Sequence, residues 1–300
     1  MAVMIHVLTT RRHAYTIGDF LAGPGAPLAG QVRSVPYDEA LRAPQVPLAG
    51  DVWIFADYDR LGSDDTLLAS QLWRRLSEGG CRLLNHPSRS LRRYELLRTL
   101  HEEGENLFDV YRVVDLREPA RYPVFLRRLD SHVGPASKLL PDRPALRRAI
   151  EGAREAGWPM DALAIVEFCE TKDASGLYRK FGVMRIGDAV FPLQALTDRQ
   201  WIVKHASDCI WDEATIGYER HYFERFPHRE MVMRVFERAR IQYGRVDFAV
   251  KDGRMQVWEI NTNPTIYGNA AKLAVRAECA ARAMTDVAKG LAALAGPPAA

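Results

Sequence analysis

The stretch Gly244–Gly268 reads GRVDFAVKDGRMQVWEINTNPTIYG and carries most of the information about the fold. It contains two runs, Arg245–Val250 and Met255–Ile260, in which strand-forming residues dominate. A short segment with Asp252 and Gly253 separates them, and such a segment is typical of a β-turn because glycine adopts positive φ without strain. The stretch therefore predicts a β-hairpin.

The length of the turn decides which side chains of this hairpin share a face. A two-residue turn would set Asp247 opposite Trp258. A three-residue turn, with Val250 paired to Arg254, would bring Asp247 onto the same face as Glu259. The second register is favoured because it separates a polar face from an apolar one. The polar face then carries Asp247, Glu259 and Asn261, and the apolar face carries Val246, Phe248, Val250, Trp258 and Ile260.

Two carboxylates and one amide oxygen on a single face suit a hard cation. Mg²⁺ takes oxygen ligands, keeps several waters and bridges to substrate phosphates. Scattered acids on an ordinary solvent-facing strand could give the same spacing, but the run Glu259–Thr265 is not typical of such a strand. Arg245 also lies on this face, two residues before Asp247. The pattern predicts a Mg²⁺ site formed by Asp247, Glu259 and Asn261.

These residues resemble the end of the C-terminal lobe in the ATP-grasp enzymes, where an R-x-D strand, a hairpin and an E-x-N-x-x-P element follow one another. Here the two motifs are Arg245–Asp247 and Glu259–Pro264. The resemblance implies that Asp247, Glu259 and Asn261 hold two Mg²⁺ ions, with Mn²⁺ as an alternative, against the phosphates of ATP. It also implies a catalytic contact from Arg245 to the transferring phosphoryl group or to the oxygens of an acyl phosphate.

The ATP-grasp lid contains a strand that ends in a phosphate-binding lysine and a glycine-rich loop. Residues 123–127 and 131–138 match these features in position, but Arg127 stands where lysine is expected and the loop has only Gly134. The resemblance implies nucleotide contacts from Arg127 and, at the end of the loop, from Lys138. An ordinary β-turn is the alternative interpretation of this loop.

The hinge between lid and C-terminal lobe is, in that family, a buried strand ending in an acidic residue beside the adenine. Residues 164–170, AIVEFCE, resemble it. The resemblance implies backbone contacts from Phe168 and Glu170 and an adenine contact from Glu167. Lys180 and Lys204 are candidate phosphate ligands, with solvated surface lysines as the alternative.

The order of the predicted elements agrees with a three-lobed architecture. Strand, helix and strand alternate up to residue 85, which predicts a small parallel α/β sheet. An antiparallel hairpin is predicted over residues 177–196, residues 212–226 are ambiguous, and one long helix is predicted from about residue 269 to 294. The fold class is thus α/β and α+β. The resemblance implies an N-terminal domain at residues 1–88, a linker helix and ATP-lid domain at 89–197, and a Mg/ATP lobe at 198–300.

The composition limits the classes of function. The 300 residues include 41 Lys and Arg against 38 Asp and Glu, a net charge of +3 that does not indicate a nucleic-acid partner. Seven of the cations are lysines, and the first of these is Lys138, so the remaining 34 are arginines. No apolar stretch has the length of a membrane span, which predicts no membrane partner. Four widely spaced cysteines without a CxxC pair suggest a reducing compartment, so a cytoplasmic location is expected.

The resemblance implies an ATP-dependent ligase that joins a carboxylate to an amine through an acyl phosphate. A small-molecule kinase on the same fold and a non-catalytic nucleotide-binding protein are the alternatives. The expected partners are small-molecule or peptide carboxylate and amine substrates, and a homodimer stays open.

Overall fold

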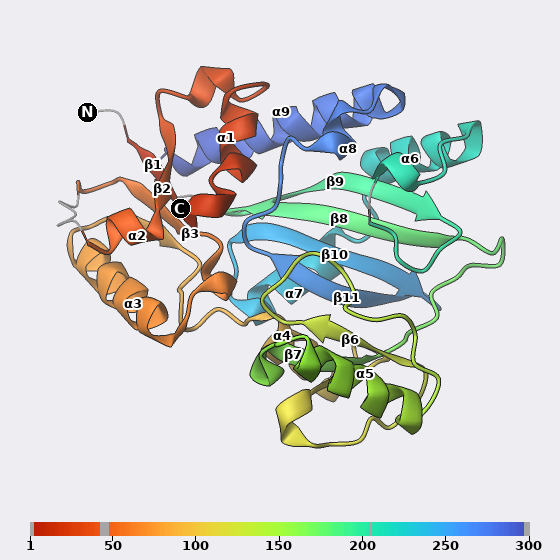
Figure 1. Ribbon diagram of the computed structural model, residues 1–300. Helices are drawn as coiled ribbons and strands as arrows, with labels where there is room; N and C mark the ends of the chain where they lie inside the picture. Colours follow the sequence, from red (N-terminus) through yellow and green to blue (C-terminus); the bar gives the residue numbers. More distant parts are fainter. Residues whose placement is uncertain (1–2, 43–47, 205, 297–300) are drawn as a thin grey trace.

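The protein is described by a computed structural model for residues 3–42, 48–204 and 206–296. Its N-terminal lobe is a four-stranded parallel sheet of β1 (Ile5–Thr9), β2 (Val32–Pro36), β3 (Val52–Phe55) and β4 (Arg82–Leu84) in the order β2-β1-β3-β4. The helices of this lobe are α1 (Tyr15–Leu21), α2 (Tyr37–Ala40) and α3 (Ser63–Glu78) (Figure 1). The parallel sheet predicted for this part of the chain is confirmed.

The carboxyl ends of the parallel strands carry buried polar groups, as expected for an open α/β sheet. Asp57, just after β3, accepts hydrogen bonds from the Thr10 backbone N–H (3.0 Å) and from Arg60 Nε (2.7 Å). Asn85, just after β4, donates from Nδ2 to the carbonyl of Tyr243 (2.7 Å). The hydrogen bonds of Asp57 thus lie within the N-terminal lobe, whereas that of Asn85 joins this lobe to the C-terminal part of the chain.

The second sheet is antiparallel and has the order β5-β7-β6, from β5 (Val110–Arg112), β6 (Val124–Arg128) and β7 (Leu163–Glu167). Helix α4 (Arg93–Glu102) leads into it, and α5 (Arg143–Glu155) covers it with Leu146. Figure 1 shows this lobe, which we call the lid lobe or lid, set apart below the rest of the molecule.

The third sheet is antiparallel, with the order β11-β10-β8-β9. It contains β8 (Tyr178–Ile186), β9 (Ala189–Asp198), β10 (Tyr243–Lys251) and β11 (Arg254–Asn261). The hairpin β8–β9, which the boundary expected at residue 197 assigns to the lid, is therefore hydrogen-bonded to β10 of the C-terminal lobe and not to the lid sheet.

Four helices accompany the third sheet: α6 (Glu213–Arg225), α7 (Arg229–Ala239), α8 (Asn269–Lys272) and α9 (Ala277–Leu294). Apolar side chains of α7 and α9 pack with Val183, Val246 and Phe248 in the largest core cluster. Helix α9 also reaches the polar face of the sheet, where its residues Ala280, Ala283 and Met284 line the cavity beside Arg245 and Asp247.

Two predictions about the C-terminal helices change. The ambiguous residues 212–226 form α6, which begins at a capping box in which Asp212 and Thr215 bond each other's backbone N–H groups. The single helix predicted from residue 269 is wrong, because Leu273 adopts an extended conformation (φ −71°, ψ 124°) and separates α8 from α9.

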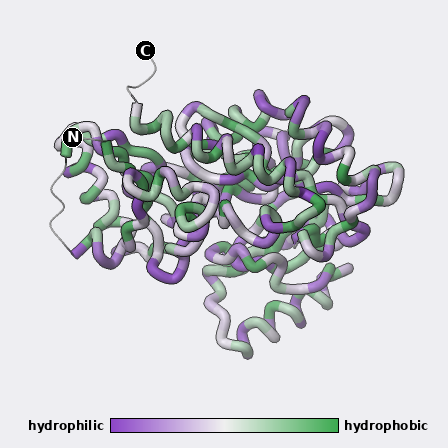
Figure 2. Tube along the Cα trace, turned by 90° about the horizontal axis from the view of Figure 1, so that it is seen from above, coloured by the Kyte–Doolittle hydropathy of each residue, from purple (hydrophilic) through white to green (hydrophobic). Residues whose placement is uncertain are grey.

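Short 3-10 helices lie at residues 11–13, 26–28, 58–60, 113–115, 160–162, 206–208 and 274–276. Hydrophilic and hydrophobic residues alternate over short intervals along the coloured part of the trace (Figure 2), as expected for elements that bury one face. Within the described ranges, no helix combines the length and the apolar character needed to cross a bilayer.

Candidate functional site

The hairpin β10–β11 brings the predicted metal ligands onto one face. Asp247 lies directly opposite Glu259, and Arg245 lies opposite Asn261. The turn itself is the two-residue one, with Lys251 paired to Arg254, so the three-residue register predicted above is wrong.

A β-bulge reconciles this turn with the observed face. The register shifts between Asp247 and Phe248, and Trp258 is the extra residue of β11. A bulge turns two successive side chains toward the same side. Trp258 and Glu259 consequently both line the cavity, and the placement of Trp258 on the apolar face is corrected.

Arg245 and Asp247 form a bidentate ion pair on this face. Arg245 Nε lies 2.5 Å from Asp247 Oδ1, and Nη2 lies 2.9 Å from Oδ2. Lys180 Nζ approaches the same carboxylate at 3.9 Å from β8. Burial opposes the charge of Arg245, but Asp247 and Glu259 raise the pKa of that guanidinium above its ordinary value.

Glu259 is held by three cationic side chains from other parts of the chain. Arg127 Nη2 from β6 lies 2.9 Å from Glu259 Oε2, and His132 Nδ1 lies 3.2 Å from it. Arg93, at the start of α4, donates to the same oxygen. Burial alone would raise the pKa of Glu259, but Arg93, Arg127 and His132 lower it well below its usual range.

His132 connects all three lobes. Its Nε2 lies 2.9 Å from Oδ2 of Asp59 in the N-terminal lobe, while its Nδ1 contacts Glu259. Asp59 Oδ1 also accepts a hydrogen bond of 2.9 Å from Thr262 Oγ1. Burial lowers the pKa of His132, but Glu259 and Asp59 outweigh it and raise that pKa above 6.5. The lid loop is thereby anchored to both other lobes at one point.

A cavity of about 760 Å³ between the three lobes is lined by Arg127, His132, Lys180, Arg245, Asp247 and Glu259 among others. Its lid side is apolar and aromatic, with Phe125, Val166, Phe168, Trp201 and Trp258. Its other side is strongly cationic. The cations in the wall are Arg60, Arg127, Arg179, Lys180, Lys204, Arg245, Lys272 and Arg276, against Asp19, Asp247 and Glu259. Such a wall can take a flat apolar group at one end and an anion in the middle.

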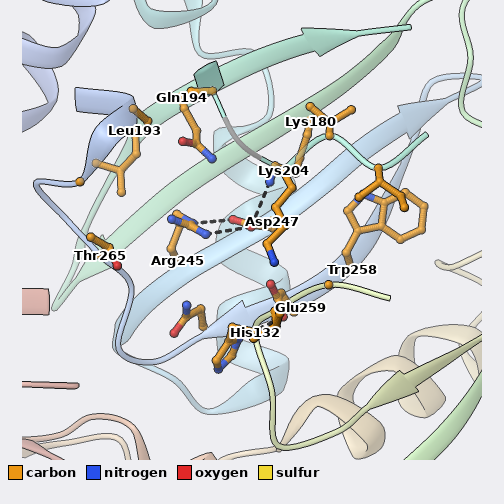
Figure 3. A pocket seen from close by; sticks show the side chains of 18 of the residues that line it. His132, Lys180, Leu193, Gln194, Lys204, Arg245, Asp247, Trp258, Glu259 and Thr265 are labelled. Atoms are coloured by element: carbon orange, nitrogen blue, oxygen red, sulfur yellow. Dashed lines mark hydrogen bonds and ion pairs between the residues drawn. The ribbon is translucent and has the colours of Figure 1, made fainter. Parts of the chain in front are cut away.

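The crowding of cations changes their titration. Burial and the charge of Arg93 lower the pKa of Arg127 to about 10, although Glu259 opposes this. Burial also lowers the pKa of Lys180, with Asp247 acting in the other direction. The pKa of Lys204 is likewise lowered, first by burial and then by the charges of Arg127 and Lys180. Figure 3 shows Lys204, Asp247 and Glu259 close together in the cavity. A bound anion would relieve this repulsion.

Several predicted residues do lie together here: Arg127, Phe168, Lys180, Lys204, Arg245, Asp247, Glu259 and Asn261 all line the cavity. Lys138 lies outside it, in a shallower depression beside Trp201. The side chain of Glu170 is exposed and bonds the backbone N–H of Lys172 (3.0 Å).

Glu167 is buried but its carboxylate faces the lid, not the cavity. It accepts hydrogen bonds from Tyr111 Oη (2.9 Å), Arg121 Nη2 (2.9 Å) and the backbone N–H of Ala120 (3.1 Å). The expected contact of this side chain with adenine does not fit the geometry, because lid groups occupy both oxygens.

The predicted hinge keeps the backbone groups that a purine could use. Within the described ranges, the carbonyl of Phe168 and the N–H of Glu170 make no backbone hydrogen bond. The expected backbone contacts at Phe168 and Glu170 are therefore compatible with the structure.

The donor set fits Mg²⁺ in its chemistry. Asp247, Glu259 and Asn261 supply oxygen atoms on one face, and Mg²⁺ completes its shell with water and phosphate oxygens. The ion pairs of Glu259 all reach Oε2, which leaves Oε1 for a cation. Across the described ranges, no cluster of three or more His, Cys, Asp or Glu side chains offers a metal site built from those residues alone.

Sequence reasoning missed Arg93, His132 and Asp59. Arg93 lies in a helix whose pattern indicated only a linker, Asp59 lies in the short 3-10 helix at residues 58–60, and His132 lies in a loop. No signal in the sequence brings residues 59, 132 and 259 together.

Comparison with known proteins gives a likeness in structure alone. No protein-family model matches the chain, and no curated protein matches it. D-alanine–D-alanine ligase from Bacillus anthracis, solved in complex with ATP, is similar with a TM-score of 0.55 at 16% identity. That alignment covers 96% of this chain and 99% of the ligase.

Two further solved structures are similar over nearly their whole length. An ATP-grasp RimK domain protein from Sphaerobacter thermophilus has a TM-score of 0.52 at 16% identity, covering 95% of this chain and 98% of that one. The ATP-grasp ligase PsnB, complexed with a minimal precursor, has a TM-score of 0.57 at 12% identity, covering 99% and 100%. At these identities the likeness establishes the fold.

Proposed function

The chain has the ATP-grasp fold, and from this and the geometry of the cavity we propose that it is an ATP-dependent ligase. It joins a carboxylate to an amine through an acyl phosphate. The observation that carries the proposal is the row of Arg245, Asp247, Glu259 and Asn261 on one face of the sheet, inside a cationic cavity with an apolar end.

In the proposed complex, the adenine of ATP lies at the apolar end, against Phe125, Val166 and Trp258. The backbone at Phe168 and Glu170 faces its polar edge. The phosphates extend toward Lys180, Lys204 and Arg127. Burial lowers the pKa of each of these cations, so a phosphate beside them would stabilise their charged forms.

Asp247, Glu259 and Asn261 would hold Mg²⁺, which when bound supplies charge neutralisation at the phosphates. Arg245 is fixed in orientation by its two bonds to Asp247, so its fork can stabilise the oxygens on which charge develops. This part of the rate enhancement comes from positioning and electrostatics, as in other phosphoryl transfers.

The bond changes are as follows. An oxygen of the carboxylate attacks the γ-phosphorus of ATP, the bond to the β–γ bridging oxygen breaks, and ADP leaves. The amine then adds to the acyl carbon, phosphate leaves, and the amine loses a proton. The sum is one amide, one ADP and one phosphate for each ATP consumed.

The test is a screen of carboxylates with ATP, Mg²⁺ and hydroxylamine, which intercepts an acyl phosphate as a hydroxamate. The proposal predicts hydroxamate and ADP in equal amounts for at least one carboxylate. A stable phosphoester product would instead identify a kinase. If neither ADP nor hydroxamate forms with any carboxylate, the proposal is wrong.

A further inference from the structure

A transverse row of four residues crosses the third sheet at the level of the proposed metal site. Gln194 on β9 pairs with Gly182 on β8, Gly182 pairs with Asp247 on β10, and Asp247 pairs with Glu259 on β11. Asp247 and Glu259 already have a role in the proposed function, and Gly182 has no side chain. Gln194, at the far end of the row, has no role in the proposed function.

The amide of Gln194 has no partner in the described part of the chain, although the residue is 92% buried (8% exposed). Its side chain lines the cavity, and Figure 3 shows the amide pointing into the cavity on the same side as Arg245. Such a group in a cavity is typical of a position where a ligand supplies the missing bonds.

A second β-bulge explains why Gln194 faces the cavity together with its neighbour. The register of β8 and β9 shifts between Gly182 and Val183, so that Leu193 is the extra residue of β9. Leu193 and Gln194 both line the cavity as a result. The two edge strands of the sheet therefore each carry a bulge beside this row, one at Trp258 and one at Leu193.

Gly182 opens the floor between Gln194 and Arg245. A Cβ at this position would lie 2.9 Å from Gln194 Cγ, 3.2 Å from Gln194 Nε2 and 3.2 Å from Arg245 Cδ. Any larger residue would push the two side chains apart. The glycine thus allows the amide and the guanidinium to converge on one small volume of the cavity.

The wall beside this volume is mainly apolar. Its apolar members are Leu193, Ile266, Ala280, Ala283 and Met284. Arg276, which donates to the carbonyl of Leu193 (3.1 Å), is bonded twice to Glu219, at 2.9 Å from Nε to Oε2 and at 2.7 Å from Nη2 to Oε1. A charged substituent against this apolar wall would be desolvated without a partner of opposite charge.

We propose that Gln194, Leu193 and the facing side chains of α9 form a subsite for the acyl part of the carboxylate substrate. The Gln194 amide hydrogen-bonds a polar atom on the carbon next to the reacting carboxylate, and the apolar wall holds an uncharged substituent. The proposal rests on the ligase function above. The subsite would favour carboxylates that have an apolar substituent and an amine or hydroxyl on the carbon next to the carboxylate. Carboxylates without the amine or hydroxyl, and those with a second carboxylate, would be poorer substrates.

The test compares three carboxylates of the same carbon skeleton in the hydroxamate assay: leucine, 2-hydroxy-4-methylpentanoate and 4-methylpentanoate, with glutamate as the charged probe. The wild-type protein is expected to prefer one of the first two over 4-methylpentanoate by about tenfold in kcat/KM, the value of one hydrogen bond. Glutamate is expected to be the poorest substrate. In Gln194→Leu the preference falls to about one, while the KM for ATP stays unchanged.

The control is Gln71→Leu, the same change at an exposed position of α3. Leu193→Ala provides a second readout, because a wider apolar wall should shift the preference toward larger apolar substituents. Melting temperatures confirm that each variant is folded.

The outcomes separate the two proposals. If the wild type forms hydroxamate but Gln194→Leu lowers kcat/KM for all three skeletons by the same factor, Gln194 is structural and the subsite is refuted while the ligase stands. If glutamate equals leucine in the wild type, the uncharged wall is refuted. If none of the four carboxylates and no other carboxylate in the screen yields hydroxamate, the ligase function fails and the subsite with it.

Discussion

Arg93 should be a main support of the contact between lid and C-terminal lobe. Its side chain is 4% exposed, and Nη1 donates to three carbonyls of the lid loop, those of Arg128 (3.0 Å), Leu129 (3.0 Å) and Ser131 (2.7 Å). Its Nη2 contacts Glu259. Arg93→Met keeps much of the volume of the side chain and removes every one of these bonds.

The expected loss follows from these partners. Breaking a buried charge pair costs about 3–5 kcal/mol, because the remaining partners stay desolvated. Arg127 and His132 continue to neutralise Glu259, so the lower part of this range applies to the ion pair. The three carbonyls that lose their donor raise the cost again. We expect a total of about 4 kcal/mol, which corresponds to a fall of roughly 10 °C in Tm.

The assay is thermal unfolding followed by circular dichroism, with Arg89→Met as the matched control at an exposed position four residues earlier. Arg93→Lys should lose roughly half as much, because an ammonium cannot reproduce the planar fork. A Tm for Arg93→Met within about 1 °C of that for Arg89→Met would refute the reasoning.

Three further predictions concern the site itself. Asp247→Asn removes a charge from the metal ligand set and loosens Arg245, so Mg²⁺-dependent ATP turnover should fall about 100-fold; turnover within a factor of two of the wild type, measured as ADP release, would exclude the metal assignment. Arg127→Ala should raise the Kd for ATP about tenfold in calorimetry, whereas Arg128→Ala, which removes a half-exposed lid pair with Asp130, should leave it unchanged. His132 has a folded-state pKa above its ordinary 6.5, so its stabilising charge is fully present below pH 6.5 and is lost as the pH rises through the folded value. The Tm should consequently decline as the pH rises above 6.5, and a His132→Asn variant with the same decline would contradict this assignment.

The local alternation of residues was enough to predict most of the fold. The alternation of strands and a helix up to residue 85 predicted the parallel N-terminal sheet, and the run at residues 177–196 predicted the β8–β9 hairpin. The break at Leu273 was not predictable, because the alanine-rich segment on both sides favours a helix. The two β-bulges could not be predicted either, because a bulge depends on the pairing of two strands and not on the sequence of one strand.

Some residues of the candidate site could likewise be predicted from the sequence, and others could not. Arg245, Asp247, Glu259 and Asn261 are close together in the sequence, and their spacing along two strands was sufficient to place them on one face. Arg93, His132 and Gln194 come from three distant segments, and only the folded chain brings His132 and Gln194 to the cavity and Arg93 to Glu259. Glu167 was misjudged because the same buried strand end can bind a ligand or stabilise its own lid.

The scarcity of lysine in the sequence extends to the lid strand of the proposed ATP site. The lid strand carries Arg127 where a lysine was expected, and this arginine is bound to Glu259 in the structure. A guanidinium offers two donors in one plane, so Arg127 can keep one bond to Glu259 while another N–H reaches a phosphate.

The most direct test of the proposed function is transfer of ¹⁸O from a labelled carboxylate to phosphate. The carboxylate that gives hydroxamate in the screen is labelled in both oxygens and incubated with ATP, Mg²⁺ and an amine. An acyl-phosphate mechanism predicts one ¹⁸O atom in each phosphate released. Unlabelled phosphate formed together with amide would contradict it.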